Sequence, residues 1–372
     1  MSKKRVLIAM SGGVDSSLTA VLLKKQGYDV IGVTMRLWST DKPELLSQRY
    51  NTCCSPTDVE DARKIAEQYD FPYYLMDCEG DFEKEVIDYF CNEYATGRTP
   101  NPCILCNSQI KLGTLLKKAK AMNAEYIATG HYARVDYDNK LHRFLLKKSL
   151  DKNKDQTYYL FNLTQEQLSH FITPLGEYTK NDVRKMAKEF GLKVADKPES
   201  QEICFVADNK YENFLKNKLD KKFFKQGNIV NTKGEILGKH KGIPFYTIGQ
   251  RKGLGISYPT PLYVLKIDTK KNQIIVGENE ETYSSSLIAE KINLISLPEI
   301  NKPIRAKAKI RYRSPEAQAT IEPLKNNKVR VIFDESQRAI TPGQAVVFYD
   351  DDIIIGGGWI YLVPKPQLGN EL

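Results

Sequence analysis

A short segment near the N-terminus has the residue types and spacing of a phosphate-binding loop. It reads Ser-Gly-Gly-Val-Asp-Ser-Ser at positions 11–17 and follows an apolar run that ends at Met10. Glycines let successive backbone amides turn toward one anion, and a helix that begins near Ser16 would aim free N–H groups at the same point. The Gly-Lys-Ser/Thr ending of a Walker A motif is absent, so the loop predicts phosphate binding without γ-phosphoryl transfer.

Asp15 is an unexpected member of this loop, because a carboxylate repels phosphate. A Mg²⁺ ion that bridges the carboxylate and the phosphates would account for it. We therefore expect ATP and Mg²⁺ as the ligands of this loop, with Asp15 as a candidate contact of the metal.

The cysteines are the second group of residues that could do chemistry. Cys103 and Cys106 form a Cys-x-x-Cys within the proline-rich segment 99–107, and Cys204 stands alone in Glu-Ser-Gln-Glu-Ile-Cys-Phe at 199–205. If Asn107 caps the helix that follows, Cys106 lies near a helix N-terminus, which lowers the pKa of a thiol. The pattern therefore predicts reactive thiols in this part of the chain.

Three interpretations of these thiols stay open on spacing alone. A zinc site would need a fourth ligand, which Cys53 or Cys54 could supply, and an iron–sulfur site could use the same residues. The third interpretation is a redox pair of Cys106 and Cys204, which the proline-rich loop and the remote single cysteine favour. Cys78 and Cys91 are expected to be buried apolar residues.

Composition bounds the class of protein. The chain has 372 residues, 41% hydrophobic and 27% charged, which indicates a globular protein of two or three domains. No apolar run has the length of a membrane span, and the N-terminal Met-Ser-Lys-Lys leads directly into a strand pattern, so we expect a cytoplasmic protein without a leader. Seven cysteines make a disulfide framework unexpected, and a net charge of +9 favours a polyanionic partner.

Strand and helix patterns alternate over the first two hundred residues. Strands are expected at 5–10, 29–35, 72–77 and 125–129, and helices at 18–26, 55–69, 79–94 and 107–122. This order predicts an α/β fold with a doubly wound, mostly parallel sheet. Ser11, Met35 and Gly130 each follow a strand, so we expect them to line one pocket at the carboxyl edge of the sheet.

The pattern changes after about residue 205. A lysine-rich helix at 211–225 precedes short strands with glycine turns, and an all-β pattern that fits a small closed barrel begins near residue 290. We therefore predict a catalytic domain at 1–207, a β-rich connecting domain at 208–288 and a C-terminal β-barrel at 289–366.

Every second residue from Arg305 to Arg313 is basic. On one strand these side chains would share a face, while Ala306, Ala308, Ile310 and Tyr312 pack inward. Like charges this close together repel one another unless an anion is near, so we expect this face to contact the phosphates of a nucleic acid. The alternative is a solvated edge strand protected by its charges.

Three segments together resemble one family. They are the loop at 11–17, the Thr-Pro-Asn-Pro-Cys-x-x-Cys-Asn segment at 99–107, and Ser-Gln-Glu-Ile-Cys-Phe at 200–205. These segments look like those of the tRNA-specific 2-thiouridylases of the PP-loop ATP pyrophosphatase superfamily. Further matches lie at 129–132, 154–160, 247–255 and 310–313, so the resemblance covers nearly the whole chain.

The resemblance implies an ATP-dependent sulfurtransferase that 2-thiolates the wobble uridine, position 34 of tRNA. ATP would adenylate the uridine O2 and release pyrophosphate, after which sulfur replaces the oxygen and AMP leaves. In the family pattern, Cys204 carries a persulfide and Cys106 acts as nucleophile or resolving thiol, so a disulfide between them would form and need reduction. The implied partners are the tRNA anticodon stem-loop and a persulfide donor, either a cysteine desulfurase or a relay protein.

The same resemblance implies the site residues. The nucleotide would contact Ala9, Met10, Ser11, Gly12, Gly13, Val14, Asp15, Ser16, Met35 and Gly130. The tRNA would contact Asn101, Pro102 and Cys103 at the flipped base, and elsewhere His131, Lys154, Asp155, Gln156, Arg311, Tyr312 and Gln344. Two other functions remain: another PP-loop adenylating enzyme, such as an amide-forming ligase or a lysidine-type synthetase, and a non-catalytic RNA-binding protein ordered by zinc.

Overall fold

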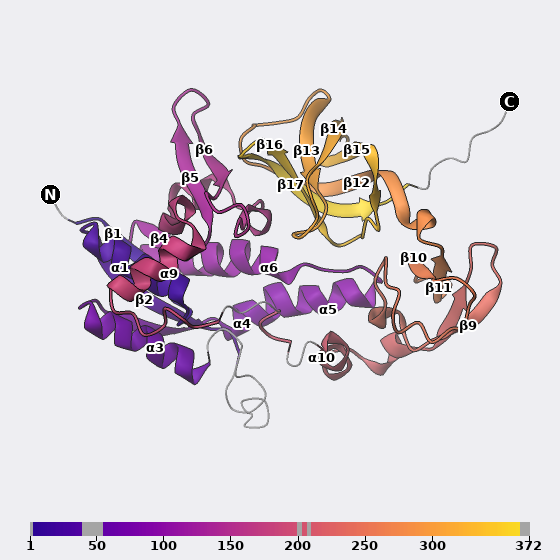
Figure 1. Ribbon diagram of the computed structural model, residues 1–372, viewed down its shortest axis with the longest axis horizontal. Helices are drawn as coiled ribbons and strands as arrows, with labels where there is room; N and C mark the ends of the chain where they lie inside the picture. The colour runs from indigo at the N-terminus through magenta and orange to yellow at the C-terminus, as the bar shows by residue number, and fades with distance from the viewer. Residues whose placement is uncertain (1–2, 39–54, 199–202, 207–209, 365–372) are drawn as a thin grey trace. The chain divides into compact units, whose positions relative to one another are not determined.

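The computed structural model describes residues 3–38, 55–198, 203–206 and 210–364 (Figure 1). The chain divides into two compact units that interleave along the sequence. Unit 1 comprises residues 1–87, 102–209 and 352–354, and unit 2 comprises residues 88–101, 210–351 and 355–372. No helix among the described residues is long and apolar enough to cross a membrane.

Unit 1 is built on a five-stranded parallel sheet with the order β3-β2-β1-β4-β7. The strands are β1 (Arg5–Ala9), β2 (Asp29–Arg36), β3 (Tyr73–Asp77), β4 (Tyr126–Ala128) and β7 (Phe171–Ile172). Alternate residues of β1 point to opposite faces, and Val6 and Ile8 share one apolar core with Leu18, Ala62 and Val183. The helices that carry this core are α1 (Val14–Lys25), α3 (Pro56–Gln68) and α9 (Lys180–Glu189). The predicted doubly wound fold is confirmed.

Two further helices, at residues 79–95 and 102–121, each contain a π-helical segment. The first helix runs through α4 (Glu79–Phe82), a π segment at Glu83–Ile87, and α5 (Asp88–Ala95). The second runs through α6 (Pro102–Leu105), a π segment at Cys106–Thr114, and α7 (Leu115–Ala121). Single π turns are frequent at functional sites, because they change which side chains face a given direction.

The start of the second helix corrects one expectation. The helix begins at Pro102, so Asn107 does not cap it and Cys106 lies one turn inside it. The Asn107 side chain is buried and its Nδ2 donates to the Tyr159 carbonyl at 3.4 Å. Cys106 is therefore not at the helix N-terminus, and the reason given above for a lowered thiol pKa does not apply.

The rest of unit 1 consists of a hairpin and short helices. The hairpin pairs β5 (Ala133–Asp138) with β6 (Arg143–Lys148), and Lys147 of β6 also pairs with Ile353. The short helices are η3 (Thr157–Tyr159), α8 (Gln165–Ser169) and η4 (Pro174–Glu177).

Unit 2 contains a four-stranded sheet and a closed six-stranded barrel. The sheet has the order β10-β11-β8-β9, with strands at Tyr263–Asp268, Gln273–Gly277, Gly227–Val230 and Ile236–His240. The barrel strands are β12 (Tyr283–Leu294), β13 (Ile304–Lys309), β14 (Ala317–Leu324), β15 (Lys328–Arg338), β16 (Ala345–Asp350) and β17 (Ile353–Leu362). Pairing of β12 with β17 closes the barrel. The predicted barrel is confirmed.

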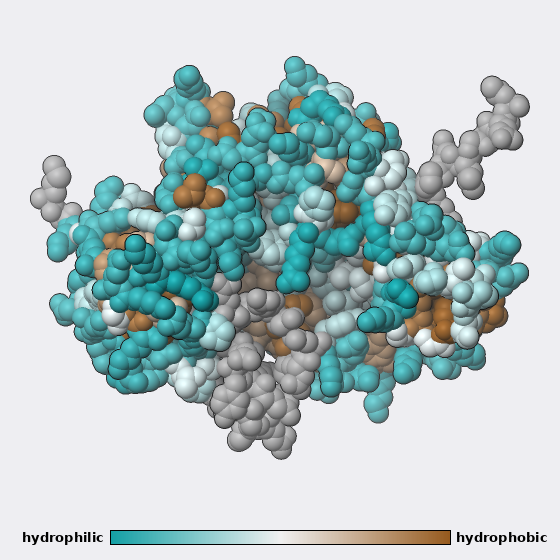
Figure 2. Space-filling view, viewed as in Figure 1, coloured by the Kyte–Doolittle hydropathy of each residue, from teal (hydrophilic) through white to brown (hydrophobic). Residues whose placement is uncertain are grey.

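Helical segments complete unit 2. They are α10 (Tyr211–Lys218), η6 (Lys221–Phe224), η7 (Ile243–Phe245) and η8 (Glu280–Thr282). The α5 helix also belongs here, because Phe90 packs edge-on against Phe214 and Tyr94 stacks on Tyr211 with ring centroids 4.9 Å apart. Hydrophilic residues cover most of the described surface in Figure 2, and a hydrophobic area lies over the β8–β11 sheet, where Ile236 is 64% exposed.

The basic strand differs from its prediction in two respects. Strand β13 ends at Lys309, so Arg311 and Arg313 lie in the turn after it and do not continue the stripe. Two of its charges are also matched within unit 2, because Arg305 pairs with Asp334 at 2.6 Å and Lys307 with Asp351 at 3.0 Å. The inward packing of Ala306, Ala308 and Ile310 is as expected, whereas Tyr312 is only half-buried.

Candidate active site

The loop between β1 and α1 has the geometry of an anion cradle. Gly12 has a φ of +69°, and a side chain there would place its Cβ 2.3 Å from the Asp58 carbonyl oxygen. Only glycine fits both the left-handed backbone and this close approach. Gly13 is the N-cap of α1 and supplies no capping side chain, so no side chain bonds to the first-turn N–H groups from the cap position.

Hydroxyl groups hold the loop in shape. The Ser11 amide donates to the Ser16 Oγ at 3.1 Å, and the Ser16 hydroxyl donates to the Gly13 carbonyl at 3.3 Å. Ahead of the loop, Met10 is buried, and its backbone N–H and carbonyl bond to Val33 and Thr34 of the neighbouring strand. The loop therefore leaves the sheet in one fixed direction.

The strand ends expected at one pocket are partly brought together. A side chain at Gly130, just after β4, would place its Cβ 2.7 Å from the Ser16 amide nitrogen and 2.9 Å from the Asp15 Cβ. Gly130 therefore contacts the N-terminal turn of α1 directly. Ala9 is the last residue of β1 and Val14 the first of α1, and Met35 is buried near the carboxyl end of β2.

The Asp15 carboxylate already has protein partners. Lys180 Nζ lies 2.7 and 2.8 Å from its two oxygens, and the Tyr132 hydroxyl donates to Oδ1 at 2.8 Å. Gln156 fixes Tyr132 in turn, because its Oε1 accepts from the Tyr132 amide at 2.9 Å. Both oxygens of Asp15 thus accept hydrogen bonds from the protein, and the contact of Asp15 with Mg²⁺ stays a prediction.

A second lysine, Lys197, contacts the same loop although it lies 185 residues later in the chain. Lys197 Nζ donates to the Gly12 carbonyl at 3.1 Å and pairs with Asp58 at 2.6 Å and Asp61 at 2.7 Å. Burial lowers the pKa of Lys197, but the two carboxylates outweigh this effect and raise the pKa above its usual value. Lys197 therefore carries its charge next to the loop at neutral pH.

Sequence reasoning missed three members of this cluster, which are Lys180, Tyr132 and Lys197. Tyr132 lies in a segment that matched the family, at 129–132, but nothing local indicated its bond to Asp15. Lys180 did have a local signal. A lysine at the first position of a helix is unfavourable to the helix dipole, which suggests that its side chain has another role.

The residues Lys154, Asp155 and Gln156 form a loop between β6 and η3. Asp155 Oδ1 accepts from the Ser149 amide at 3.2 Å, and its Oδ2 accepts from the Thr157 hydroxyl at 2.7 Å. The Lys154 amide donates to the Asp151 carbonyl at 3.0 Å. Asp155 and Gln156 therefore use their side chains to hold the fold around Tyr132.

His131 is a buried, neutral residue. It is 8% exposed, its Nδ1 lies 2.6 Å from the Thr129 hydroxyl, and its ring meets Phe171 edge-on. Burial, helped by the nearby Lys111 charge, holds the pKa of His131 well below its usual 6.5. The side chain is therefore uncharged at neutral pH.

The segments that carry the two reactive-thiol candidates both contact α4. Cys106 and Cys204 are half-buried residues of unit 1. Phe205, next to Cys204, packs its ring 5.7 Å from Phe82 of α4, and the π segment that starts at Cys106 bonds to the same helix through Thr114 and Asp81 at 2.8 Å. One helix therefore contacts both cysteine-bearing segments, and the pairing of Cys106 with Cys204 stays a prediction.

Cys78 lies close to this group but has a different character. It is the N-cap of α4, is 3% exposed, and feels the charge of Cys106. Burial raises the pKa of the Cys78 thiol to about 11. Cys78 is therefore protonated at neutral pH and is a poor nucleophile.

Three known domain models match successive parts of the chain. The domain models that match are a tRNA methyl transferase HUP domain at 4–208, a tRNA methyl transferase PRC-barrel domain at 212–278 and an aminomethyltransferase beta-barrel domain at 284–360. A tRNA-specific 2-thiouridylase MnmA of Acetivibrio thermocellus is 54% identical over 361 residues, which is 97% of this chain and 100% of the relative. The MnmA of Clostridioides difficile is 52% identical over 96% of this chain and 98% of its own. This chain belongs to the tRNA-specific 2-thiouridylase family.

The predicted family and sulfurtransferase class are thereby confirmed. Solved structures are more remote from this thiouridylase-family chain. A 4-thiouridine synthetase in complex with RNA and bound ATP is 16% identical, covers 59% of this chain and 51% of its own, and has a TM-score of 0.36. An NMN synthetase from Francisella tularensis is 15% identical, with coverages of 59% and 79% and a TM-score of 0.34.

Four residues predicted to contact tRNA lie in unit 2 of this thiouridylase-family chain. Gln344 donates to the carbonyls of Thr99 and Pro100 at 2.9 and 3.1 Å, which fixes the segment that leads to Asn101. Arg311 donates to the carbonyls of Arg338 and Ala339. Lys309 Nζ lies 5.5 Å from the ring centroid of Tyr312. Pro102, which is buried, and Cys103 belong to unit 1.

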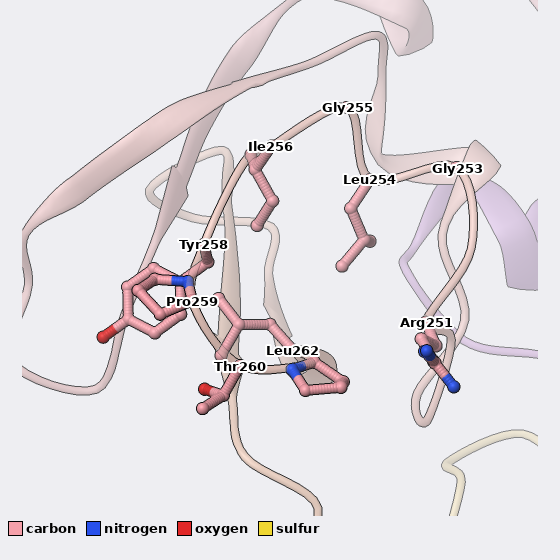
Figure 3. Close-up of a pocket in the computed structure, with 10 residues that line it drawn as sticks. Arg251, Gly253, Leu254, Gly255, Ile256, Tyr258, Pro259, Thr260 and Leu262 are labelled. Atoms are coloured by element: carbon pink, nitrogen blue, oxygen red, sulfur yellow. The ribbon is translucent and has the colours of Figure 1, made fainter.

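Two other features of this thiouridylase-family chain bear on ligands. A shallow pocket in unit 2 is formed by the loop from Arg251 to Leu262, and none of the predicted site residues lines it (Figure 3). Over the residues that the structure describes, no three His, Cys, Asp or Glu side chains are grouped as metal ligands. Cys53 and Cys54 lie outside the described residues, so the zinc and iron–sulfur interpretations that include them are untested.

Proposed function

We propose that this chain uses ATP to replace the O2 of the wobble uridine of tRNA with sulfur. The observation that carries the proposal is the combination within unit 1 of a phosphate cradle at 11–17 and two cysteine segments that both contact α4. Full-length relatives at 54% identity that are named tRNA-specific 2-thiouridylases support it.

The first step is activation of the uridine carbonyl. The O2 oxygen attacks the α-phosphorus of ATP, the bond to the β-phosphate breaks and pyrophosphate leaves, while the N3 proton is lost. A urea-like carbonyl oxygen is a poor leaving group, whereas AMP is a good one, so the step divides one difficult displacement into two easier ones. The loop from Ala9 to Ser16, with Gly130 against it, binds the phosphates through backbone amides.

The second step delivers the sulfur. Cys204 carries a persulfide, the Cys106 thiolate attacks the Cys204 sulfur, and the terminal sulfur leaves as hydrosulfide. Hydrosulfide attacks C2, the C2–O bond breaks, AMP leaves with the oxygen, and the proton of the sulfur ends on N3. The resulting disulfide between Cys106 and Cys204 is returned to two thiols by a dithiol reductant. The persulfide itself comes from a donor protein, a cysteine desulfurase or a relay protein.

The tRNA is proposed to reach both units. Asn101, Pro102 and Cys103 border the flipped uridine, and Arg311 and Tyr312 contact the anticodon stem-loop. Asp155, Gln156 and Gln344 contribute by holding loops, which their side-chain hydrogen bonds support. Lys154 is the member of its loop best suited to a phosphate, whereas the neutral, buried His131 can serve only as an uncharged contact.

Several parts of the assignment remain proposals about the whole protein. Magnesium is proposed to arrive with ATP, and Asp15 is its candidate protein contact. Domain limits at 1–207, 208–288 and 289–366 are proposed for the catalytic, connecting and tRNA-binding parts, with a cytoplasmic location.

Nucleoside analysis of tRNA tests the proposal. Cells that lack the gene should lose 2-thiouridine at the wobble position, and the wild-type gene should restore it. Cys204→Ser and Cys106→Ser should each lower restoration about a thousandfold or more, because each removes a sulfur that forms or breaks a bond. Cys91→Ala, a buried position in unit 2, is the matched control and should restore thiolation.

Other outcomes would identify the two competing functions. Full activity of Cys204→Ser with ATP-dependent pyrophosphate release would indicate an amide-forming or lysidine-type enzyme. Stoichiometric zinc without pyrophosphate release would indicate a non-catalytic RNA-binding protein. Unchanged 2-thiouridine in the deletion strain would reject the proposal directly.

A further inference from the structure

A buried lysine lies at the start of a helix, where two physical effects oppose it. Lys180 is the first residue of α9 and is only 8% exposed. A cation at a helix N-terminus faces the positive end of the helix dipole, and removing an ammonium from water is costly. Its backbone N–H bonds to Asp151 Oδ2 at 3.0 Å, and Thr179 and Asp182 form a capping box around it. The main chain of Lys180 is therefore fixed, and the Nζ is the end that can change partners.

The Lys180 ammonium points at the phosphate cradle. It bonds to both oxygens of Asp15, the second residue of α1, at 2.7 and 2.8 Å, and lies 5.7 Å from the Tyr132 ring centroid. Tyr132 contacts Asp15 independently through its hydroxyl. Asp15 would therefore keep one hydrogen bond from the protein if Lys180 turned to another anion.

The charge of the cradle requires such a cation. A leaving pyrophosphate carries several negative charges, and the segment 11–17 contains a carboxylate but no lysine or arginine. Two lysines bond to this segment among the described residues: Lys180 to the Asp15 carboxylate and Lys197 to the Gly12 carbonyl. Lys197 is divided between Asp58, Asp61 and the Gly12 carbonyl, whereas the Lys180 Nζ bonds to both oxygens of Asp15 within the loop itself. A polyphosphate offers Lys180 more negative charge than Asp15 does.

We propose that Lys180 is a further catalytic residue, which contacts the β- and γ-phosphates of ATP and stabilises the departing pyrophosphate. This proposal rests on the proposed function of the site. Before ATP binds, the Asp15 carboxylate holds the ammonium in place and neutralises it. On binding, the Lys180 Nζ exchanges carboxylate oxygens for phosphate oxygens, and the Tyr132 hydroxyl keeps Asp15 in position. Lys180 thus supplies the charge that the loop lacks.

A simple lysine deletion would be ambiguous, because Lys180→Met leaves the Asp15 carboxylate buried and uncompensated. That charge would itself repel phosphate and could destabilise the fold. The double variant Asp15→Asn/Lys180→Met removes both charges with little change in side-chain size. It separates a lysine that binds phosphate from a lysine that only neutralises Asp15. Lys188→Met is the matched control, since Lys188 is an exposed residue of the same helix, paired with Asp196 at 2.9 Å.

The experiment measures binding of inorganic pyrophosphate to the full-length protein by calorimetry, with and without Mg²⁺, alongside the melting temperature of each variant. We expect the double variant to bind pyrophosphate about tenfold to a hundredfold more weakly than the wild type, as loss of a charge-assisted contact implies. Lys180→Arg should recover part of the affinity, and Lys188→Met should bind within about twofold of the wild type. In ATP–pyrophosphate exchange, the double variant should lose kcat more than it raises KM for ATP.

Wild-type affinity in the double variant would overturn the proposal, because Lys180 would then serve only to neutralise Asp15. Equal weakening by Lys188→Met would also overturn it, since the effect would then be one of general charge. The binding assay needs neither tRNA nor sulfur. A strain that keeps 2-thiouridine without this gene would therefore reject the proposed function, whereas the Lys180 assay would still report on the phosphate site.

Discussion

The phosphate-loop region of unit 1 and the basic strand β13 of unit 2 both pair cations with carboxylates, but in different surroundings. Lys180 and its partner Asp15 have side chains 10% and 28% exposed, whereas Arg305 and Asp334 are 56% and 49% exposed. Distances are similar in the two regions, at 2.7 and 2.6 Å. The two ion pairs therefore differ in how deeply they are buried and not in their N–O distance.

Burial changes what each pair contributes. An exposed pair is weak, because water and salt screen it and two long side chains lose freedom. A buried pair depends strongly on both partners, since loss of one leaves a charge without solvent. We conclude that a single substitution in the loop region should affect stability and ligand binding, whereas a single substitution on β13 should affect neither strongly.

The largest expected effect comes from Gly12→Ala. Alanine would require a left-handed backbone at φ +69° and would place its Cβ 2.3 Å from the Asp58 carbonyl oxygen. We expect a loss of about 3 kcal/mol in the free energy of unfolding, together with loss of ATP use. Gly13→Ala is the control, with a φ of −90° and its nearest neighbour 3.6 Å away, and should cost less than about 1 kcal/mol. Equal losses in urea unfolding of the two variants would contradict the packing seen at Gly12.

A smaller effect is expected for Lys197→Met. The change removes the partner of Asp58 and Asp61 beside the loop, at a site where the lysine side chain is 28% exposed. We expect unfolding in urea to show a loss of about 2 kcal/mol, less than for a fully buried pair. Lys188→Met, which breaks an exposed pair with Asp196, should change stability by less than about 0.5 kcal/mol. If the two variants lose the same free energy of unfolding, the expected difference between the partly buried and the exposed ion pair is wrong.

The pH dependence of stability provides a third measurement. The pKa of His131 is held well below 6.5 by burial, so the unfolded chain binds a proton there below pH 6.5 while the folded chain does not. Stability should therefore fall with decreasing pH from 6.5, by up to about 1.4 kcal/mol per pH unit from this group. Burial also lowers the pKa of His240 in unit 2, although a hydrogen bond to Asn272 offsets part of this. His131→Asn should flatten the profile more than His240→Asn, and an unchanged slope in His131→Asn would show that its charge is tolerated.

The smallest effect is expected on β13. Arg305→Gln removes an exposed charge that Asp334 already matches at 2.6 Å. We expect a change of less than about 0.5 kcal/mol in stability and less than about twofold in tRNA affinity. The slope of log affinity against log salt should stay constant, whereas a fall of about 0.9 would assign a phosphate contact to Arg305 and contradict this interpretation.

Local patterns predicted most of the fold. The parallel sheet followed from alternating apolar strands and helices, and the barrel followed from short strands with two-residue periodicity. Ser55 and Pro56 predicted the start of α3, where a capping box is present. The earlier start of the helix at Pro102 also had a local signal, because Asn-Pro is typical of a cap followed by the first helical residue.

The candidate site was less predictable because its contacts are long-range. Lys180 lies 165 residues from Asp15, and Lys197 lies 139 residues from Asp58. No periodicity connects such positions. The predicted stripe of unpaired charges on β13 was wrong for a related reason. Its partners Asp334 and Asp351 come from other parts of the barrel sequence, and no local pattern connects them with β13.

The interleaving of the two units has a consequence for synthesis on the ribosome. Residues 88–101 emerge early but belong to unit 2, and the aromatic partners of Phe90 and Tyr94 come from α10, which is translated more than a hundred residues later. Until then the apolar side of α5 has no native partner from that helix. A nascent chain stopped at residue 208 would therefore lack both of these aromatic contacts, and incompletely packed apolar surface of this kind is what chaperones bind.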